Sequence, residues 1–114
     1  VVSIDRHADF VDRARARLTA DAVTNVHLET ADVFAWQPTG AFDAICITGA
    51  VATRPERFAD WLRPGGRLFV VHGASPVQEA LLITRDGEGL LRESLFETDI
   101  PYLHGAAPVP GFTL

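Results

Sequence analysis

A carboxylate, Asp5, ends the short apolar run Val1–Asp5 and directly precedes an amphipathic segment. In α/β sheets that bind nucleotides, an acidic residue at the tip of a strand accepts hydrogen bonds from the two ribose hydroxyls. Its negative charge strengthens both bonds, which a neutral side chain does less well. Asp is also a common cap for the helix that follows it. The position of Asp5 alone therefore leaves a nucleoside site and a helix cap as alternatives.

A second candidate site is the sequence Thr48-Gly49-Ala50, which comes at the end of the most apolar segment, 41–48. Ligands of open α/β sheets lie at the carboxyl edge of the strands. Gly49 lacks a side chain, so a ligand can approach its backbone closely. The alternative is an ordinary turn between a strand and a helix, with Thr53 as the helix cap.

No metal site is expected, because His27, His72 and His104 lack the spacing and the acidic or thiol neighbours of a ligand set. Cys46 lies inside an apolar run, which predicts a buried and inert thiol. As the single cysteine it can form no internal disulfide, which fits a reducing, cytoplasmic compartment.

Charge and hydropathy exclude two classes of partner. The formal net charge of −5 argues against nucleic acid, because affinity for phosphates is built from clustered basic residues. Arg13, Arg15 and Arg17 form a basic cluster, but Asp9 and Asp12 balance it, so a solvated helix face is predicted. No apolar stretch approaches the ~20 residues that cross a bilayer, so no membrane partner is expected.

Strand and helix patterns alternate along the chain, which is typical of a parallel sheet with crossover helices. The predicted strands span residues 1–5, 25–30, 41–48 and 67–72, and the predicted helices span 8–20 and 54–62. Two further strands, 78–85 and 90–98, flank Asp86-Gly87-Glu88-Gly89, which is a strong hairpin signal. The fold class is therefore α/β, with a mostly parallel sheet that ends in an antiparallel hairpin.

The same patterns predict which parts are buried. One stripe of the first helix is apolar and should face the core: Phe10, Val11, Ala14 and Leu18. The segment 41–48 is almost continuously apolar, which predicts a strand covered on both faces. The tail after Tyr102 is rich in proline and glycine and is expected to lie irregularly on the surface.

The chain begins where the second strand of a nucleotide-binding sheet begins, with Val1 where an initiator Met would stand. It contains neither the first strand nor the glycine-rich turn that normally precede an acidic strand tip. We therefore expect the C-terminal part of one longer cofactor-binding domain. Within it, residues 1–73 form βα units, 74–105 the hairpin region and 106–114 an irregular tail.

Five segments taken in order carry a resemblance to a known family: VVSIDRHADFVDRARARL, NVHLETAD, FDAICITGA, LRPGGRLFVVHG and QEALLITRDGEGLLRESLFETDIPYL. They resemble the protein-L-isoaspartate O-methyltransferases from Val1 to about Gly105. The resemblance implies a Rossmann-like methyltransferase fold, here without its first strand and glycine-rich loop, and S-adenosylmethionine as cofactor. It also implies methyl transfer to the carboxyl group of L-isoaspartyl residues in damaged proteins, which is a repair reaction.

The resemblance further implies which residues contact the cofactor. Asp5 would hold the ribose, and Arg6 and His7 would pack against the adenine. Asp32 would accept a hydrogen bond from the adenine amino group, and the adjacent backbone amide at Val33 would meet a ring nitrogen.

This chain departs from the family at residues 31–33, where Ala31 and Val33 replace the glycines of a Gly-Asp-Gly pattern. If the loop needs a positive φ there, Val33 would be strained. A helix cap ahead of residues 33–36 is the alternative role for Asp32.

On the substrate side, the resemblance implies that the loop after segment 41–48 places the acceptor beside the methyl group. It assigns Thr48 to the cofactor site and four residues to the substrate site: Gly49, Ala50, Tyr102 and His104. The family often has Phe-Val-Pro-Leu where this chain has Ile100-Pro101-Tyr102-Leu103. No catalytic residue is assigned, because a carboxylate acceptor with a pKa near ~4 is already ionised at pH 7.

Other interpretations stay open. The divergent substrate loops allow a methyltransferase with a different acceptor, and Ala31 and Val33 allow a non-catalytic cofactor-binding or interaction module. The hairpin and Asp32 speak against a nicotinamide-dependent oxidoreductase. A missing N-terminal part, or another copy of the chain, is expected to complete the sheet, because two strands would otherwise expose unpaired edges. The isolated chain is therefore expected to be inactive.

Overall fold

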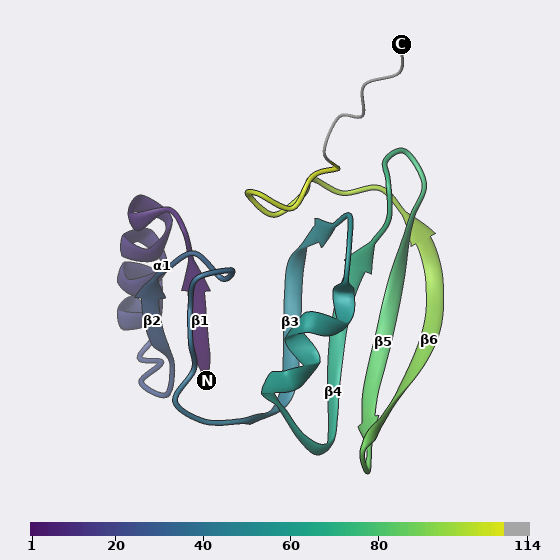
Figure 1. The fold of residues 1–114 in the computed structure, drawn as a ribbon. Coiled ribbons are helices and arrows are strands. Elements are labelled where there is room, and N and C mark those ends of the chain that lie inside the picture. Colours follow the sequence, from purple (N-terminus) through teal and green to yellow (C-terminus); the bar gives the residue numbers. More distant parts are fainter. Residues whose placement is uncertain (109–114) are drawn as a thin grey trace. The chain divides into compact units, whose positions relative to one another are not determined.

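The computed structural model describes residues 1–108. Pro110 and Gly111, which the sequence assigns to an irregular tail, lie outside the described residues. The chain divides into two compact units, residues 1–39 and 40–114, which are considered separately (Figure 1). No helix in the described part has both the length and the apolar character needed to cross a membrane.

The first unit consists of two parallel strands joined by a helix (Figure 1). Strand β1 spans Val2–Asp5, helix α1 spans Ala8–Ala20 and strand β2 spans His27–Thr30. In the register of the pair, Val2 lies opposite His27 and Asp5 lies opposite Thr30. The bounds of α1 are those that the sequence predicts, and the parallel pair confirms the predicted crossover.

Most of the predicted apolar stripe of α1 is covered. Val11 is 4% exposed, and Ala14 and Leu18 are half-buried. Phe10 is 48% exposed, so its predicted burial is wrong. It lies about 100° around the helix from Val11, at the margin of the stripe. Its ring instead contacts that of His7, with the two centroids 5.0 Å apart.

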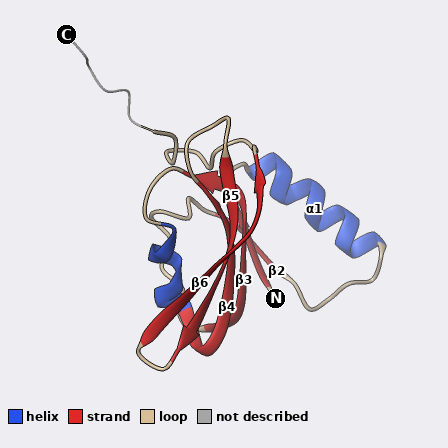
Figure 2. Cartoon of the chain, turned by 90° about the vertical axis from the view of Figure 1, so that its right-hand side faces the viewer, coloured by secondary structure: helices blue, strands red, loops and turns tan. Residues whose placement is uncertain are grey.

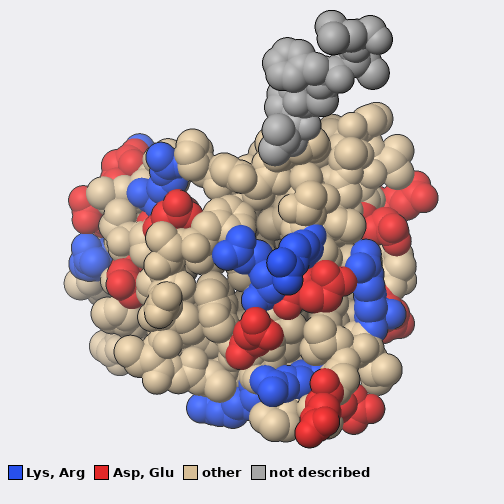
Figure 3. All heavy atoms as spheres, viewed as in Figure 1, with Lys and Arg blue, Asp and Glu red and all other residues tan. Residues whose placement is uncertain are grey.

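The basic cluster of α1 forms a solvated face, as predicted. Arg13 pairs with Asp9 at 3.4 Å and Arg15 pairs with Asp12 at 3.2 Å, and all four side chains are more than half exposed. Such exposed pairs add little stability. On the face of the molecule seen in Figure 3, basic and acidic side chains are interspersed.

The second unit contains a four-stranded mixed sheet and a short 3₁₀ helix (Figure 2). Its elements are β3 (Phe42–Val51), the 3₁₀ helix η1 (Pro55–Trp61), β4 (Leu62–His72), β5 (Gln78–Asp86) and β6 (Gly89–Thr98). The strand order is β3-β4-β5-β6, in which β3 and β4 are parallel and the other two pairs are antiparallel. Asp86 lies opposite Gly89, so the predicted hairpin is confirmed, and Gly87 provides the positive φ of its turn, +60°.

The core of the second unit includes η1 and one face of the sheet. The register puts Leu68 opposite Ile83 and Val70 opposite Leu81, so these four side chains share a face. Each of them is at most 1% exposed, as is Phe58 of η1. Burial of such side chains stabilises a fold by about 1.5–3 kcal/mol each.

Strand β3 extends beyond its predicted end at residue 48 and is not covered on both faces. Alternate residues, Ala44, Cys46 and Thr48, are exposed. The predictions of a doubly covered strand and of a buried Cys46 thiol are therefore wrong. The physical reason is that η1 packs on the opposite face of the sheet, where its Glu56 pairs with Arg92 of β6 at 2.7 Å.

Candidate functional site

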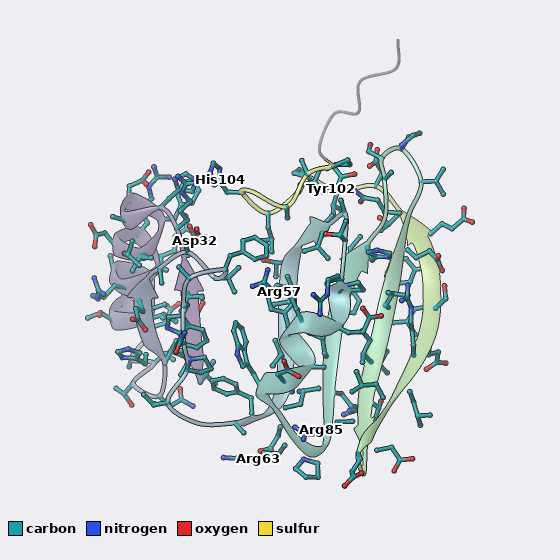
Figure 4. All side chains as sticks on the ribbon, viewed as in Figure 1. Asp32, Arg57, Arg63, Arg85, Tyr102 and His104 are labelled. Carbon is teal, nitrogen blue, oxygen red and sulfur yellow. The ribbon has the colours of Figure 1, made fainter. Side chains whose placement is uncertain are left out.

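Asp5 and Asp32 lie at the same carboxyl edge of the β1–β2 pair. Asp5 is the last residue of β1 and lies opposite Thr30, the last residue of β2. The amide of Ala31 donates to the backbone oxygen of Asp5 at 2.9 Å, which carries the pairing up to the residue before Asp32. Both acidic side chains are exposed (Asp32 is labelled in Figure 4). The parallel pairing thus brings both predicted acids to one edge of the first unit.

Each carboxylate is oriented by a backbone amide two residues further along the chain. Oδ1 of Asp5 accepts a hydrogen bond from the amide of His7 at 2.8 Å, and Oδ1 of Asp32 accepts one from the amide of Phe34 at 3.0 Å. Oδ2 of either residue makes no hydrogen bond with the described part of the chain. Neither acid is a helix cap, because the N-cap of α1 is His7 without a side-chain cap bond and residues 33–35 form a turn rather than a helix. In each acid one oxygen orders the local backbone and the other can accept from a ligand.

The residues that adjoin these acids show no backbone strain. Arg6 and His7 are exposed, and Val33 is half-buried. Among the described non-glycine residues, a positive φ occurs at Ala22 and Arg54. The loop around Asp32 therefore adopts its conformation without glycine. Within residues 1–108, no cluster of three or more His, Cys, Asp or Glu side chains could hold a metal ion.

In the second unit, a segment that follows β6 returns to the end of β3; we call residues 101–106 the return segment. Three backbone hydrogen bonds join it to β3 and the residue after: Ala50 N–H to Pro101 C=O (3.0 Å), Leu103 N–H to Ala50 C=O (2.9 Å) and Ala52 N–H to Ala106 C=O (2.9 Å). The bridge between Ala50 and Tyr102 is parallel. Residues 103–108 form no helix or strand, as predicted for the tail, but these hydrogen bonds hold residues 103–106 against the end of β3.

Gly49 and Ala50 lie at the end of β3 and Tyr102 and His104 lie in the return segment that pairs with it (the last two are labelled in Figure 4), so the predicted substrate-side residues share this end of the second unit. Thr48 is exposed on β3, and His104 is exposed in a turn of the return segment. Ala50 is fully buried and its N–H and C=O both bind the return segment, so Ala50 positions that segment. The hydroxyl of Tyr102 donates to the backbone oxygen of Gly73 at 3.0 Å.

Gly49 packs closely against the return segment. A Cβ at this position would lie 2.7 Å from Cδ2 of Leu103, which is closer than carbon atoms approach. We predict that Gly49→Ala lowers the free energy of unfolding by about 1–3 kcal/mol, because the return segment must shift. Denaturant unfolding measures this, and Gly40→Ala is the matched control because a Cβ there meets open space. Equal midpoints for the two variants would contradict the close packing.

Sequence reasoning missed the polar residues that hold the return segment from its other side. The amide of Ser75 donates to the Tyr102 hydroxyl at 2.8 Å, and Oε1 of Gln78 accepts from the amide of Ile100 at 2.8 Å. No spacing rule marks Ser75 and Gln78, because their partners come 27 and 22 residues later in the chain and only the folded sheet brings them together.

A sequence profile described as protein-L-isoaspartate(D-aspartate) O-methyltransferase matches residues 1–102. The chain is 36% identical over 107 residues to a protein-L-isoaspartate O-methyltransferase of Ectopseudomonas mendocina, covering 92% of this chain and 51% of that protein. It is 36% identical over 110 residues to protein-L-isoaspartate O-methyltransferase 2 of Rhodopseudomonas palustris, covering 94% of this chain and 51% of that protein. The chain thus spans about half the length of the curated relatives it matches.

Solved structures share the fold. One is a Plasmodium falciparum protein described as a putative protein-L-isoaspartate O-methyltransferase in complex with S-adenosyl-L-homocysteine. Its TM-score is 0.78 at 21% identity, and the match covers 90% of this chain and 51% of that chain. Another protein-L-isoaspartate O-methyltransferase gives a TM-score of 0.77 at 24% identity, and the match covers 90% of this chain and 33% of that chain. The predicted Rossmann-like fold class is confirmed.

Proposed function

The chain belongs to the protein-L-isoaspartate(D-aspartate) O-methyltransferase family, and on this premise we propose that it forms part of an enzyme that repairs damaged proteins. The reaction would transfer a methyl group from S-adenosylmethionine to the carboxyl group of an L-isoaspartyl residue. The observation that carries the proposal is the pair of similarly oriented carboxylates, Asp5 and Asp32, at one edge of a parallel strand pair.

The residues present fit the nucleoside part of this cofactor. Asp5 would accept hydrogen bonds from the ribose hydroxyls, and Asp32 would accept one from the adenine amino group. Arg6, His7 and Val33 adjoin these acids in sequence and would complete the contacts around the adenine. When bound, the cofactor supplies a methyl group that is activated by a positively charged sulfur.

The acceptor needs little chemical help from the protein. Its carboxylate is ionised at pH 7, because the reference pKa of such groups is near ~4. The contribution of the protein is then to hold an acceptor oxygen in line with the methyl group, which is a proximity and orientation effect. Gly49, Ala50 and the return segment with Tyr102 and His104 are the groups that we assign to this end of the site, and Thr48 is assigned to the cofactor.

We also propose a partner and a compartment. β1 pairs with β2 and β3 pairs with β4. Within the described residues, the topology leaves unpaired the other edge of β1 and the other edge of β3 up to Ala50, where the return segment pairs with it. An N-terminal part, or a second copy of the chain, would pair with these edges. A single cysteine that can form no internal disulfide supports a cytoplasmic location.

A second candidate function keeps the cofactor but changes the acceptor. It is favoured by Ile100-Pro101-Tyr102-Leu103, where the family often has Phe-Val-Pro-Leu. In a third, non-catalytic alternative, the chain would bind the cofactor or a partner without transferring a methyl group.

A transfer assay separates these candidates. We expect a complete enzyme containing this chain to methylate an isoaspartyl peptide at least about 100-fold faster than the same peptide with normal aspartate. The reason is that a normal aspartyl residue holds its carboxylate out of line with the methyl group. Incorporation of a labelled methyl group into the two peptides is the measurement. Equal labelling would favour a different acceptor, and no labelling of either peptide or of a total protein extract would favour the non-catalytic alternative.

A further inference from the structure

The return segment carries two of the proposed substrate-side residues, Tyr102 and His104, and β3 holds only one side of it. On its other side the segment meets the loop between β4 and β5, residues 73–77. That loop is itself bonded to the end of β3, because the amide of Gly73 donates to the backbone oxygen of Val51 at 3.1 Å. This hydrogen bond holds the loop next to the end of β3, where the loop contacts the return segment.

One hydroxyl group makes the main link between loop and segment. The hydroxyl of Tyr102 donates to the backbone oxygen of Gly73 at 3.0 Å and accepts from the amide of Ser75 at 2.8 Å. A single side-chain atom thus satisfies both a donor and an acceptor of the loop backbone. Phenylalanine would fill the same space but would leave both backbone groups without this partner.

A buried carboxamide adds a second link just before the segment. Gln78 is fully buried, and its Oε1 accepts from the amide of Ile100 at 2.8 Å. Its Nε2 is also buried and has no hydrogen-bond partner in the described residues. An unpaired buried donor is costly, and an apolar side chain would avoid that cost. What the carboxamide provides in return is the acceptor for Ile100.

A third link comes from the exposed side of the loop. Oγ of Ser75 donates to Oδ1 of Asp99 at 2.8 Å. The stretch from Asp99 to Tyr102 is thus bonded to the loop and to the start of β5 through three of its four residues, Asp99, Ile100 and Tyr102. The position of the return segment depends on these side chains as well as on its pairing with β3.

We propose that Tyr102 and Gln78 are positioning residues for the methyl acceptor, because their hydrogen bonds fix the return segment beside the carboxyl end of β3. This inference rests on the proposed function, in which the return segment contacts the acceptor. Asp5 and Asp32, which we assign to the cofactor, have no hydrogen bond to this network. Loss of the network should therefore weaken acceptor binding and leave cofactor binding unchanged.

The test uses Tyr102→Phe and Gln78→Met in a complete enzyme that contains this chain. Each variant should raise KM for an isoaspartyl peptide about tenfold, change kcat less than about threefold and leave the Kd for S-adenosylmethionine unchanged. The control is Ser94→Ala, which removes another hydroxyl bond of the hairpin, to Glu79 at 2.6 Å, in which the return segment takes no part. Its KM should equal that of the wild type.

Amide hydrogen exchange provides a readout that does not depend on activity. The amides of Leu103 and Ala52, which join the return segment to β3, should exchange at least about tenfold faster in both variants and not in Ser94→Ala. Unchanged KM and unchanged exchange would overturn the inference, as would a parallel loss of cofactor affinity. If the wild type methylates no isoaspartyl peptide, the proposed function fails, and exchange alone decides whether these residues position the segment.

Discussion

Replacing Asp5 with alanine should weaken the binding of S-adenosylmethionine by about 100-fold in a complete enzyme that contains these residues. The carboxylate lies exposed at the carboxyl edge of β1 and keeps Oδ2 free of protein partners among the described residues. Two charge-assisted hydrogen bonds to a ribose contribute about 1.5 kcal/mol each at the lower end of their range. Their joint loss, about 3 kcal/mol, corresponds to roughly two powers of ten in Kd.

Two further variants separate this effect from changes in the fold. Asp5→Asn keeps an oxygen that can accept from the amide of His7 and removes only the charge, so about a tenfold loss of affinity is expected. Asp12→Ala removes an acid of α1 that pairs with Arg15 on the solvated face, and it should leave affinity unchanged. Isothermal titration measures all three, and a Kd for Asp5→Ala within threefold of the wild type would remove Asp5 from the site.

Asp32→Ala extends the same experiment to the adenine end of the proposed ligand. Loss of one hydrogen bond to the amino group should cost about tenfold in affinity. A module that never uses the cofactor would lose no function in either alanine variant, so the pair also tests the non-catalytic alternative.

Features set by local sequence were predicted well. Helix α1 has the predicted bounds, Ala8–Ala20, because an apolar stripe at helical spacing marks it without reference to distant residues. The hairpin turn at Gly87 was also predicted, because a glycine-rich turn between two apolar runs is a short-range signal. Asp5 and Asp32 were recognised as strand-tip acids, and parallel pairing then brings them to one edge.

Features set by distant residues were predicted poorly. The apolar run around Cys46 indicates a strand that is suited to burial on both faces, but whether a second layer covers it depends on elements outside that run. β4 begins at Leu62 rather than at residue 67, because pairing with Phe42 extends the strand through a turn-like Pro-Gly-Gly sequence. The position of the return segment also depends on distant residues, because Ala50 and the loop at Gly73 hold it by hydrogen bonds.

The same dependence on distant elements leads to the last prediction, which concerns the 114 residues by themselves. Within the described residues, one edge of β1 is unpaired, and so is one edge of β3 before Ala50. Large apolar side chains are exposed as well, such as Leu91 at 59% and Phe96 at 56%. Unpaired edges and exposed apolar surface favour association. We therefore expect the isolated chain to self-associate and to bind S-adenosylmethionine with a Kd above about 1 mM, against micromolar binding by a complete enzyme.

The decisive comparison supplies the other half of a curated relative's length as a separate polypeptide, because this chain spans about half of those proteins. If that half pairs with the open edges, mixing the two parts should yield a defined complex with cofactor affinity at least about 100-fold above that of the isolated chain. Sedimentation velocity and isothermal titration on the same samples measure assembly and affinity together. A monomeric isolated chain with micromolar affinity would show that β1, β2 and the acids at their tips form a sufficient site, and the need for a completing strand would then be refuted.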